Sequence, residues 1–439
     1  MRAAVSEWPR VVLAEVASSL GGLWGEADPA CDQEEVLALR GTDFERVRRN
    51  DLRSVPTRYV APTTLQRRML DASCVVIEAS GGSKDQPVGR TLLISQAMLD
   101  LADAPLSAAS FCKILRVDTS IAIPRFVSSV LENAYTSREI ERFQTQSTGL
   151  RNLRTKQLMA EFHFRLPPIS TQRRIAAVLS AFDELIEINE RRISLLEDLA
   201  RSLYREWFVH FRFPGHEEVE FVNSELGAIP EGWEVRASGA VLSSLGGGTP
   251  SKKRADYWNG GLIPWFIPSD LTRSRNRYVA DSKTQITTLG LKESGARMFP
   301  AGSVLMTSRA TLGVLAITTR ESTCNQGFIV IPPLNDVPSE FIYEWLANQE
   351  PQLAAIATGA TFKEITKAAF KRFPFLLPTR PILATFAQAV GPVGEQISTY
   401  ERQNRALAAT RDLLLPRLVT GRLDISDIDL GGLLTADAE

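Results

Sequence analysis

Basic residues gather in two stretches of the chain, and both stretches also contain small or hydroxyl residues. Residues 40–68 hold eight arginines against three acids, and residues 252–277 hold six basic residues against two acids. Such side chains contact phosphate oxygens, and an arginine can also donate two hydrogen bonds to one guanine. Both stretches predict contact with a nucleic acid, and a solvated basic surface is the alternative for each. The candidate contact residues are Arg46, Arg48, Arg49, Arg53, Arg58, Lys84, Arg90, Lys252, Lys253, Arg254, Arg273, Arg275, Arg277, Ser308 and Arg309.

Two turns are expected to present some of these side chains. Residues 74–95 and 301–318 each predict a strand, a short turn and a second strand. Lys84 and Arg90 supply the charge in the first segment, and the second turn carries Ser308 and Arg309. The first turn combines glycines with a lysine, but it lacks the spacing of a nucleotide-binding P-loop. We therefore expect both turns to contact a phosphate backbone or base edges.

Residues for catalysis or for a metal site are sparse. The three histidines are scattered, and the four cysteines form no C-x-x-C pair, so we expect buried thiols in a reducing compartment and no metal site. The sequence contains neither an N/D-P-P-Y/F loop nor a glycine-rich cofactor motif after a strand, the motifs that would indicate a methyltransferase. Asp270, Asp281 and Lys283 imitate the spacing of a metal-dependent nuclease, a short pattern that arises easily by chance. We expect no catalytic residue and no cofactor on this chain, and a DNA-cleaving enzyme is kept as an alternative.

Composition is that of an ordinary globular protein. The 439 residues predict two to four domains, and the net charge of −1 taken alone argues against a nucleic-acid partner. Charge is segregated, however, since five acids and no basic residue follow Arg422, and local fields govern encounter with DNA. No run of 18 apolar residues and no signal-peptide core is found, so a cytoplasmic location is expected.

The chain contains an internal repeat. Residues 164–167 match residues 375–378, and at the same offset of 211 the match continues to Leu203 and Leu414. Trp8 and Trp233 each open one half. The order is therefore variable region, helix, variable region, helix, and the helices resemble each other better than the regions between them do.

Both repeated segments predict long helices with a coiled-coil seam. Heptad spacing of apolar residues continues over about 33 residues, or about 50 Å, after a proline-containing turn. Separated by a domain, the two helices are expected to pair antiparallel and to hold two heads apart by ~15 base pairs of DNA. Two helices buried in separate cores are the alternative. The predicted seam residues are Ile175, Leu179, Phe182, Ile186, Asn189, Ile193, Leu196, Leu203, Ile397, Tyr400, Asn404, Leu407 and Leu414.

Several motifs resemble the specificity subunit of Type I restriction–modification systems. They cover nearly all of the chain in the family's order, although the first variable region lacks the "GGTP…YWNGG" segment of the second. Residue roles are therefore carried over less well to the first region. The motifs lie at residues 166–211, 247–271, 307–313, 324–328 and 413–423.

The resemblance implies an α+β protein with two α/β target-recognition domains separated by two long helices in an antiparallel intramolecular coiled coil. Each domain would read one half of a split double-stranded DNA sequence, and the dissimilar heads predict an asymmetric target. Two modification (methyltransferase) subunits would dock on the repeats, and restriction (translocase) subunits would join them. S-adenosylmethionine would belong to the modification subunit, and ATP and Mg²⁺ to the restriction subunit.

These expectations divide the chain into five parts. A coiled-coil adaptor with two protein-binding heads is the second alternative, but it does not explain paired basic loops. The predicted parts are recognition domains at 1–150 and 216–375, spacer helices at 151–215 and 376–422, and an acidic tail at 423–439.

Overall fold

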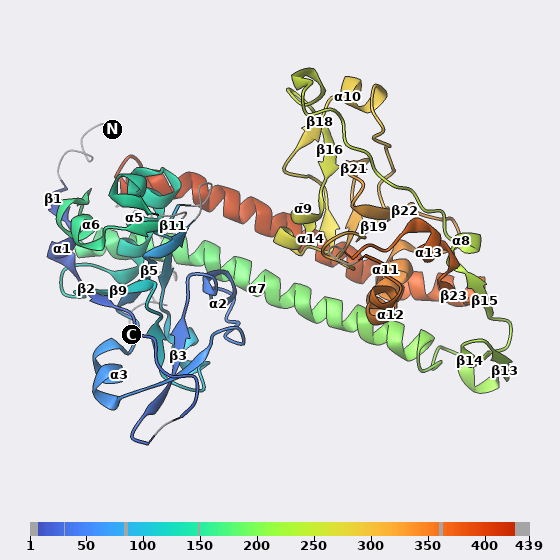
Figure 1. Ribbon diagram of the computed structural model, residues 1–439, viewed down its shortest axis with the longest axis horizontal. Coiled ribbons are helices and arrows are strands. Elements are labelled where there is room, and N and C mark those ends of the chain that lie inside the picture. The colour runs from blue at the N-terminus through green and yellow to red at the C-terminus, as the bar shows by residue number, and fades with distance from the viewer. Residues whose placement is uncertain (1–7, 30, 83–86, 148–149, 360–362, 426–439) are drawn as a thin grey trace. The chain divides into compact units, whose positions relative to one another are not determined.

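The computed structural model describes residues 8–29, 31–82, 87–147, 150–359 and 363–425 (Figure 1). The chain forms two compact units. Unit 1 consists of residues 1–187 and 406–439, and unit 2 consists of residues 188–405. Two long helices, α7 (Ile169–Phe208) and α14 (Arg380–Val419), each contribute one segment to each unit.

Unit 1 is built on a four-stranded antiparallel sheet of order β2-β9-β5-β7. Two three-stranded sheets, β4-β3-β8 and β10-β11-β6, and the pair β1-β12 complete its strands. The strands are β1 (Arg10–Val12), β2 (Ala17–Gly21), β3 (Glu34–Leu39), β4 (Thr57–Val60), β5 (Cys74–Glu78), β6 (Ser80–Gly82), β7 (Thr91–Leu93), β8 (Leu106–Ala108), β9 (Cys112–Val117), β10 (Gln144–Ser147), β11 (Leu150–Leu153) and β12 (His163–Arg165). The helices are α1 (Leu13–Val16), α2 (Phe44–Val47), α3 (Pro62–Arg68), α4 (Gln96–Asp100), α5 (Pro124–Thr136), the 3-10 helix η2 (Glu139–Phe143) and α6 (Thr155–Glu161).

The core of unit 1 lies between its central strand and two helices. Strand β5 is apolar in sequence up to Glu78 and is buried along its whole length. Helix α5 begins at Pro124, whose fixed φ suits the first helical position, and its Phe126 enters the same core cluster as Ile175 of α7. The paired helices are thereby part of the core that supports the sheet.

Unit 2 has a four-stranded sheet of order β17-β20-β19-β22, a three-stranded sheet β18-β16-β21, the hairpin β13-β14 and the pair β15-β23. Its strands are β13 (Phe221–Ser224), β14 (Gly227–Pro230), β15 (Glu234–Ala237), β16 (Ile263–Phe266), β17 (Tyr278–Val279), β18 (Gln285–Ile286), β19 (Val304–Thr307), β20 (Leu315–Thr318), β21 (Thr323–Cys324), β22 (Phe328–Ile331) and β23 (Pro374–Leu377). The helices are η3 (His216–Glu218), α8 (Ser238–Val241), η4 (Ala255–Tyr257), α9 (Pro268–Ser274), α10 (Thr288–Lys292), α11 (Ser339–Asn348), α12 (Glu350–Ala355) and α13 (Lys367–Arg372).

Aromatic side chains join the sheet of unit 2 to the helix segments. The ring of Phe208 on α7 meets Phe341 of α11 and Phe386 of α14 edge to face, at centroid distances of 4.7 and 4.9 Å. Such pairs contribute about 0.5–1.5 kcal/mol each beyond the area that they bury. Strand β19, with all four residues buried, packs in the same cluster through Val304 and Met306.

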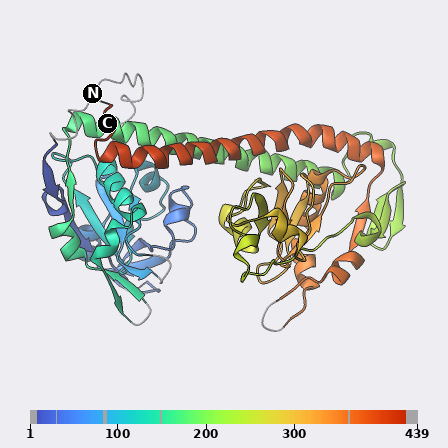
Figure 2. The ribbon, with the colours of Figure 1, turned by 90° about the horizontal axis from the view of Figure 1, so that it is seen from above.

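Helices α7 and α14 pack antiparallel within each unit, as the sequence predicted. In unit 2, Asn189 contacts Asn404, while Trp207 near the end of α7 contacts Phe386 near the start of α14. In unit 1, Arg411 Nη1 donates to Asp183 Oδ1 at 2.6 Å. Figure 2 shows the two helices side by side in each unit. Each helix has 40 residues, more than the heptad pattern covers.

The predicted seam positions have the burial that a helix seam requires. All thirteen predicted positions are buried or half-buried, whereas Leu185 and Leu195 of α7, which lie outside the seam, are 49% and 67% exposed. Asn189 Nδ2 donates to Asn404 Oδ1 at 2.9 Å. A paired amide in a seam favours one register, because any slip would leave buried donors and acceptors unpaired.

The expected strand pairs are present, as β5 with β7 in unit 1 and β19 with β20 in unit 2. In unit 1, however, the connection is not a simple turn, because strand β6 lies within it and pairs with β11. The range 151–168, predicted to belong to the first spacer, contains the end of β11, helix α6 and strand β12 before α7 begins. Most of the predicted acidic tail lies outside the described residues. Among the residues that the structure describes, no helix is both long and apolar enough to cross a membrane.

Candidate nucleic-acid interface

The two units share an entry path into their sheets. Residues 8–22 and 233–247 align without a gap at an offset of 225, and both stretches end in Ser-Ser-Leu-Gly-Gly. The offset of 225 places β1 on β15, and the offset of 211 places β12 on β23. The strand pair β1-β12 therefore corresponds to the pair β15-β23. The corresponding pairs are Val11 with Phe164 and Arg236 with Phe375. The repeat that opens at Trp8 and Trp233 therefore extends into the heads as far as Gly22 and Gly247. Only the shared "SSLGG" was missed from the sequence.

The last glycine of each path lies against another backbone. A Cβ on Gly22 would stand 2.1 Å from the carbonyl oxygen of Ala109, and one on Gly247 would stand 2.0 Å from that of Cys324. No side chain fits at such a distance, so glycine is needed for the close approach. The close backbone contact thus occurs at equivalent positions in the two heads.

A second shared feature is a residue at the end of the central strand that is held through both its backbone groups. We call it the junction residue; it is Ala79 in unit 1 and Ser308 in unit 2. Its N–H donates to a tight turn, and its C=O accepts from the segment that leads back to the long helix. The partners are Phe111 and Leu153 in unit 1 (2.8 Å each), and Gly327 (2.8 Å) and Ile365 (3.0 Å) in unit 2.

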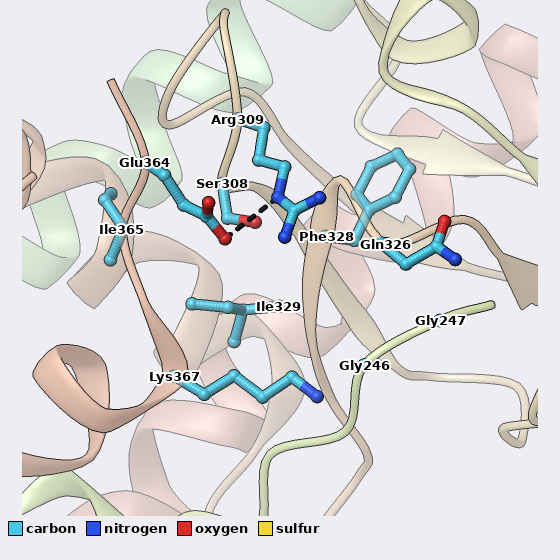
Figure 3. A pocket seen from close by; sticks show the side chains of 10 residues that line it. All are labelled: Gly246, Gly247, Ser308, Arg309, Gln326, Phe328, Ile329, Glu364, Ile365 and Lys367. Carbon is cyan, nitrogen blue, oxygen red and sulfur yellow. Dashed lines mark hydrogen bonds and ion pairs between the residues drawn. The ribbon is translucent and has the colours of Figure 1, made fainter. Parts of the chain in front are cut away.

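Beside the junction of unit 2 lies a small pocket of about 150 Å³ (Figure 3). Arg309 borders it, and its Nε donates to Glu364 Oε1 at 2.8 Å. Lys367, the first residue of α13, brings a second cation. The lining residues are Gly246, Gly247, Ser308, Arg309, Gln326, Phe328, Ile329, Glu364, Ile365 and Lys367. Glu364 and Lys367 were missed from the sequence, although they lie a few residues after Thr358-Gly359, which matches Thr148-Gly149 of the first half.

The corresponding place in unit 1 carries no arginine. The residue after the junction is Ser80, and the residue before Leu153 is Asn152. Ser80 Oγ donates to Asn152 Oδ1 at 2.6 Å. A neutral hydroxyl–amide pair in unit 1 thus occupies the position of a charged arginine–carboxylate pair in unit 2.

The predicted arginines of unit 1 form an exposed group on and after α2. Arg48 also donates to the carbonyl of Thr91, and Arg53 pairs with Asp51 at 2.9 Å. Arg58, on β4, stacks its guanidinium 4.2 Å from the ring centroid of Trp24, a half-exposed side chain that was not predicted. The exposed members are Arg46, Arg48, Arg49 and Arg53, and Arg58 is half-buried.

Two predicted contact residues have structural roles instead. Arg277 is 1% exposed and donates to Glu344 at 2.5 Å, so the prediction that it contacts a nucleic acid is wrong. Arg90 is mostly buried and donates to both oxygens of Glu78, at 2.8 and 2.9 Å, and to the carbonyl of Gly41. Both guanidinium groups are used inside the fold, and the prediction for Arg90 is corrected accordingly. Lys84 lies outside the described residues.

Ser308 is 3% exposed and is held through its backbone, so its predicted contact with a nucleic acid is corrected as well. The other predicted residues of unit 2 are exposed. Arg254 is held by Asp256 through two hydrogen bonds, of 2.9 and 2.6 Å, and covers the ring of Tyr257. Arg275 has a φ of 53° and ends helix α9 in the left-handed region. The exposed residues are Lys252, Lys253, Arg254, Arg273 and Arg275.

A buried charged cluster connects the sheet of unit 2 to helix α11 and to the segment of α14 in the same unit. Glu401 of α14 accepts hydrogen bonds from the backbone N–H groups of Arg277 (2.7 Å) and Tyr278 (3.0 Å). Burial raises the pKa of Glu401 to about 7, against the opposite effect of these two donors. Arg277 pairs with Glu344, yet its Nε and Nη2 lack a hydrogen-bond partner among the described residues.

The carboxylates of the nuclease alternative serve other purposes. Asp270 accepts from the backbone N–H of Ile267 and caps helix α9, and Asp281 pairs with Arg320. Within the described ranges, no group of three or more potential metal-ligating side chains was found.

Comparison with known proteins gives a consistent result. The family model described as the Type I restriction modification DNA specificity domain matches residues 79–198 and 230–401. The specificity subunit of the Type I restriction enzyme MjaIX of Methanocaldococcus jannaschii is 34% identical over 203 residues, which are 46% of this chain and 46% of that protein. The chain thus spans about half the length of that relative.

A second relative and a solved structure cover more of the chain. The specificity subunit of the Type I restriction enzyme HindI of Haemophilus influenzae is 21% identical over 370 residues, which are 71% of this chain and 80% of that protein. The crystal structure of the Type I restriction–modification S subunit of M. genitalium covers 95% of this chain and 97% of its own, with a TM-score of 0.55 and 13% identity. That likeness concerns the fold.

Proposed function

Because the chain belongs to the family of Type I restriction modification DNA specificity proteins, we propose that it reads the DNA target of a Type I restriction–modification complex. Each unit reads one half of a split target, and the two halves differ in sequence. The chain supplies recognition and assembly, and the chemistry belongs to its partners.

One observation supports this proposal most directly. The two units share a backbone arrangement but present different side chains on it. Both units hold a junction residue by the same backbone hydrogen bonds. At that place unit 1 presents Ser80 with Asn152, and unit 2 presents Arg309 with Glu364. Base sequence is read by side chains that a rigid backbone positions against base edges. A shared frame with different side chains fits two readers of different half-sites.

The basic surface of unit 1 supports DNA as the ligand. Four exposed arginines lie on or just after α2. Arg58 of β4 follows them closely in the sequence and stacks on Trp24. Arginines on exposed loops neutralise phosphates and release counterions. We expect them to position the duplex without selecting its sequence.

Partner subunits are proposed to bind the long helices. On the unit 2 segment of α7, Ile188, Leu195 and Leu199 are 44%, 67% and 47% exposed. Apolar residues aligned on an exposed helix face favour a protein partner. The proposed partners are two methyltransferase subunits, which bring S-adenosylmethionine, and restriction subunits, which bring ATP and Mg²⁺.

The test is genome-wide methylation mapping in cells that express the chain together with its cognate modification subunit. Cells with the modification subunit alone are the control. We expect a split, asymmetric motif only when the chain is present. A palindromic motif would contradict the proposal that the two units read different half-sites. No new motif, from a modification subunit that is active with another specificity subunit, would contradict the proposed function itself.

A further inference from the structure

Arg309 combines a fixed backbone with an exposed side chain. It follows Ser308, which is 3% exposed and is held at both its N–H and its C=O. The side chain of Arg309 is 52% exposed. The strand end therefore carries the guanidinium to the surface from a position that cannot shift without breaking two backbone hydrogen bonds.

Glu364 fixes the direction of this guanidinium. The backbones of Arg309 and Glu364 form an isolated antiparallel β-bridge, and the carboxylate accepts from Nε at 2.8 Å. A guanidinium held through Nε keeps Nη1 and Nη2 side by side on its far edge. In the described part of the chain, neither of these groups has a hydrogen bond assigned to it. Two parallel donors at a fixed spacing match the O6 and N7 acceptors of guanine in the major groove.

The pocket beside Arg309 provides room for an approaching ligand. Its wall at Gly246 and Gly247 is bare backbone, and any side chain at Gly246 would meet the Nζ of Lys367 at 2.0 Å. Figure 3 shows Arg309, Gln326 and Lys367 around the opening. Lys367 brings a second positive charge to the same pocket.

We propose that Arg309 contacts a guanine in the half-site read by unit 2, with Glu364 as its positioning residue. This inference rests on the proposed function. The equivalent pair in unit 1, Ser80 with Asn152, is neutral and cannot make the same contact. The two positions are therefore specificity determinants that act independently, each for its own half-site.

The experiment maps the methylated motif for Arg309→Ala, Arg309→Lys and Glu364→Gln, expressed with the modification subunit. Arg320→Ala is the matched control, since Arg320 is also half-exposed and paired with a carboxylate, Asp281, in the same unit. We expect Arg309→Ala to lower the preference for one guanine in one half-site by roughly 5- to 100-fold. The other half-site keeps its sequence, and Arg320→Ala keeps the whole motif.

Arg309→Lys separates a base contact from a phosphate contact. A lysine keeps the charge but loses the paired donors, so the guanine preference should fall while overall methylation remains. Glu364→Gln should relax the same position to a smaller extent. Three results would overturn the inference. The half-site read by unit 2 could lack guanine, or the motif could be unchanged by Arg309→Ala. Methylation could also fall equally at all sites in a variant that melts like the unchanged chain. No motif with the unchanged chain would overturn the proposed function, and this inference with it.

Discussion

Glu401 should make the stability of unit 2 depend on pH. The carboxyl is 3% exposed and accepts two backbone hydrogen bonds, and its pKa is raised by burial from 4.5 to about 7. In this range the folded protein holds a proton that the unfolded chain has released. The stabilisation from that proton is complete below pH 4.5 and is lost as the pH rises to about 7. At 1.36 kcal/mol for each pKa unit, the change amounts to about 3 kcal/mol.

The perturbation is Glu401→Gln, which removes the titration but keeps the shape. The uncharged amide leaves one backbone N–H poorly paired, a cost of about 1–3 kcal/mol that is the same at every pH. The difference in free energy of unfolding between variant and unchanged chain should therefore shift by about 3 kcal/mol in favour of the variant from pH 4.5 to 7.5. Glu197 and Arg405 are the charged side chains that act on the Glu401 carboxyl.

The assay is urea unfolding followed by tryptophan fluorescence at several pH values. Five of the seven tryptophans belong to unit 2, at positions 207, 233, 258, 265 and 345, so the signal reports mainly on this unit. Glu395→Gln, an exposed carboxyl on the same helix, is the control and should leave the pH dependence unchanged. The same pH dependence in Glu401→Gln as in the unchanged chain would refute the reasoning.

Three further changes test the frame. Gly247→Ala puts a Cβ 2.0 Å from a carbonyl oxygen and should lower the free energy of unfolding by about 1–3 kcal/mol. Gly295→Ala, with no atom within 4 Å of its Cβ, should leave that free energy unchanged, and urea titration compares the two variants. Glu344→Gln leaves the buried guanidinium of Arg277 without its counter-charge and should cost about 3–5 kcal/mol, seen as a lower Tm. Ile186→Asp puts a charge on the half-buried seam and should weaken assembly with the modification subunit while each unit still folds, measured by co-purification and circular dichroism.

The sequence predicted the long helices well because their signal is local. A heptad pattern depends only on spacing within one segment, and thirteen seam positions follow from it. The partner of a seam residue is less local. The sequence placed Asn189 and Asn404 on the seam, but their pairing was seen only in the structure. The strand pairs at 74–95 and 301–318 were predicted for the same reason, from short strand-forming segments separated by turn residues.

The contact residues were predicted less well because charge alone does not tell exposed from buried. Arg275 and Arg277 lie two residues apart in one basic stretch, but Arg275 is exposed and Arg277 is buried. The difference comes from Glu344 and Glu401, 67 and 124 residues further along the chain. Similarly, the importance of Glu364 depends on its bridge to Arg309 across 55 residues. Such pairings are set by tertiary structure, and one sequence does not display them.

The junction explains how the heads can share a fold and yet differ so much in sequence. Its contacts are made by backbone N–H and C=O groups, which every residue except proline supplies in full. Ala79 and Ser308 can therefore occupy one place without sharing a side chain. The glycines at 22 and 247 are the exception, because two backbones meet there and no Cβ fits. A frame that depends on backbone bonds and a few glycines leaves the adjacent side chains free to vary, and that freedom allows two related heads to read two different half-sites.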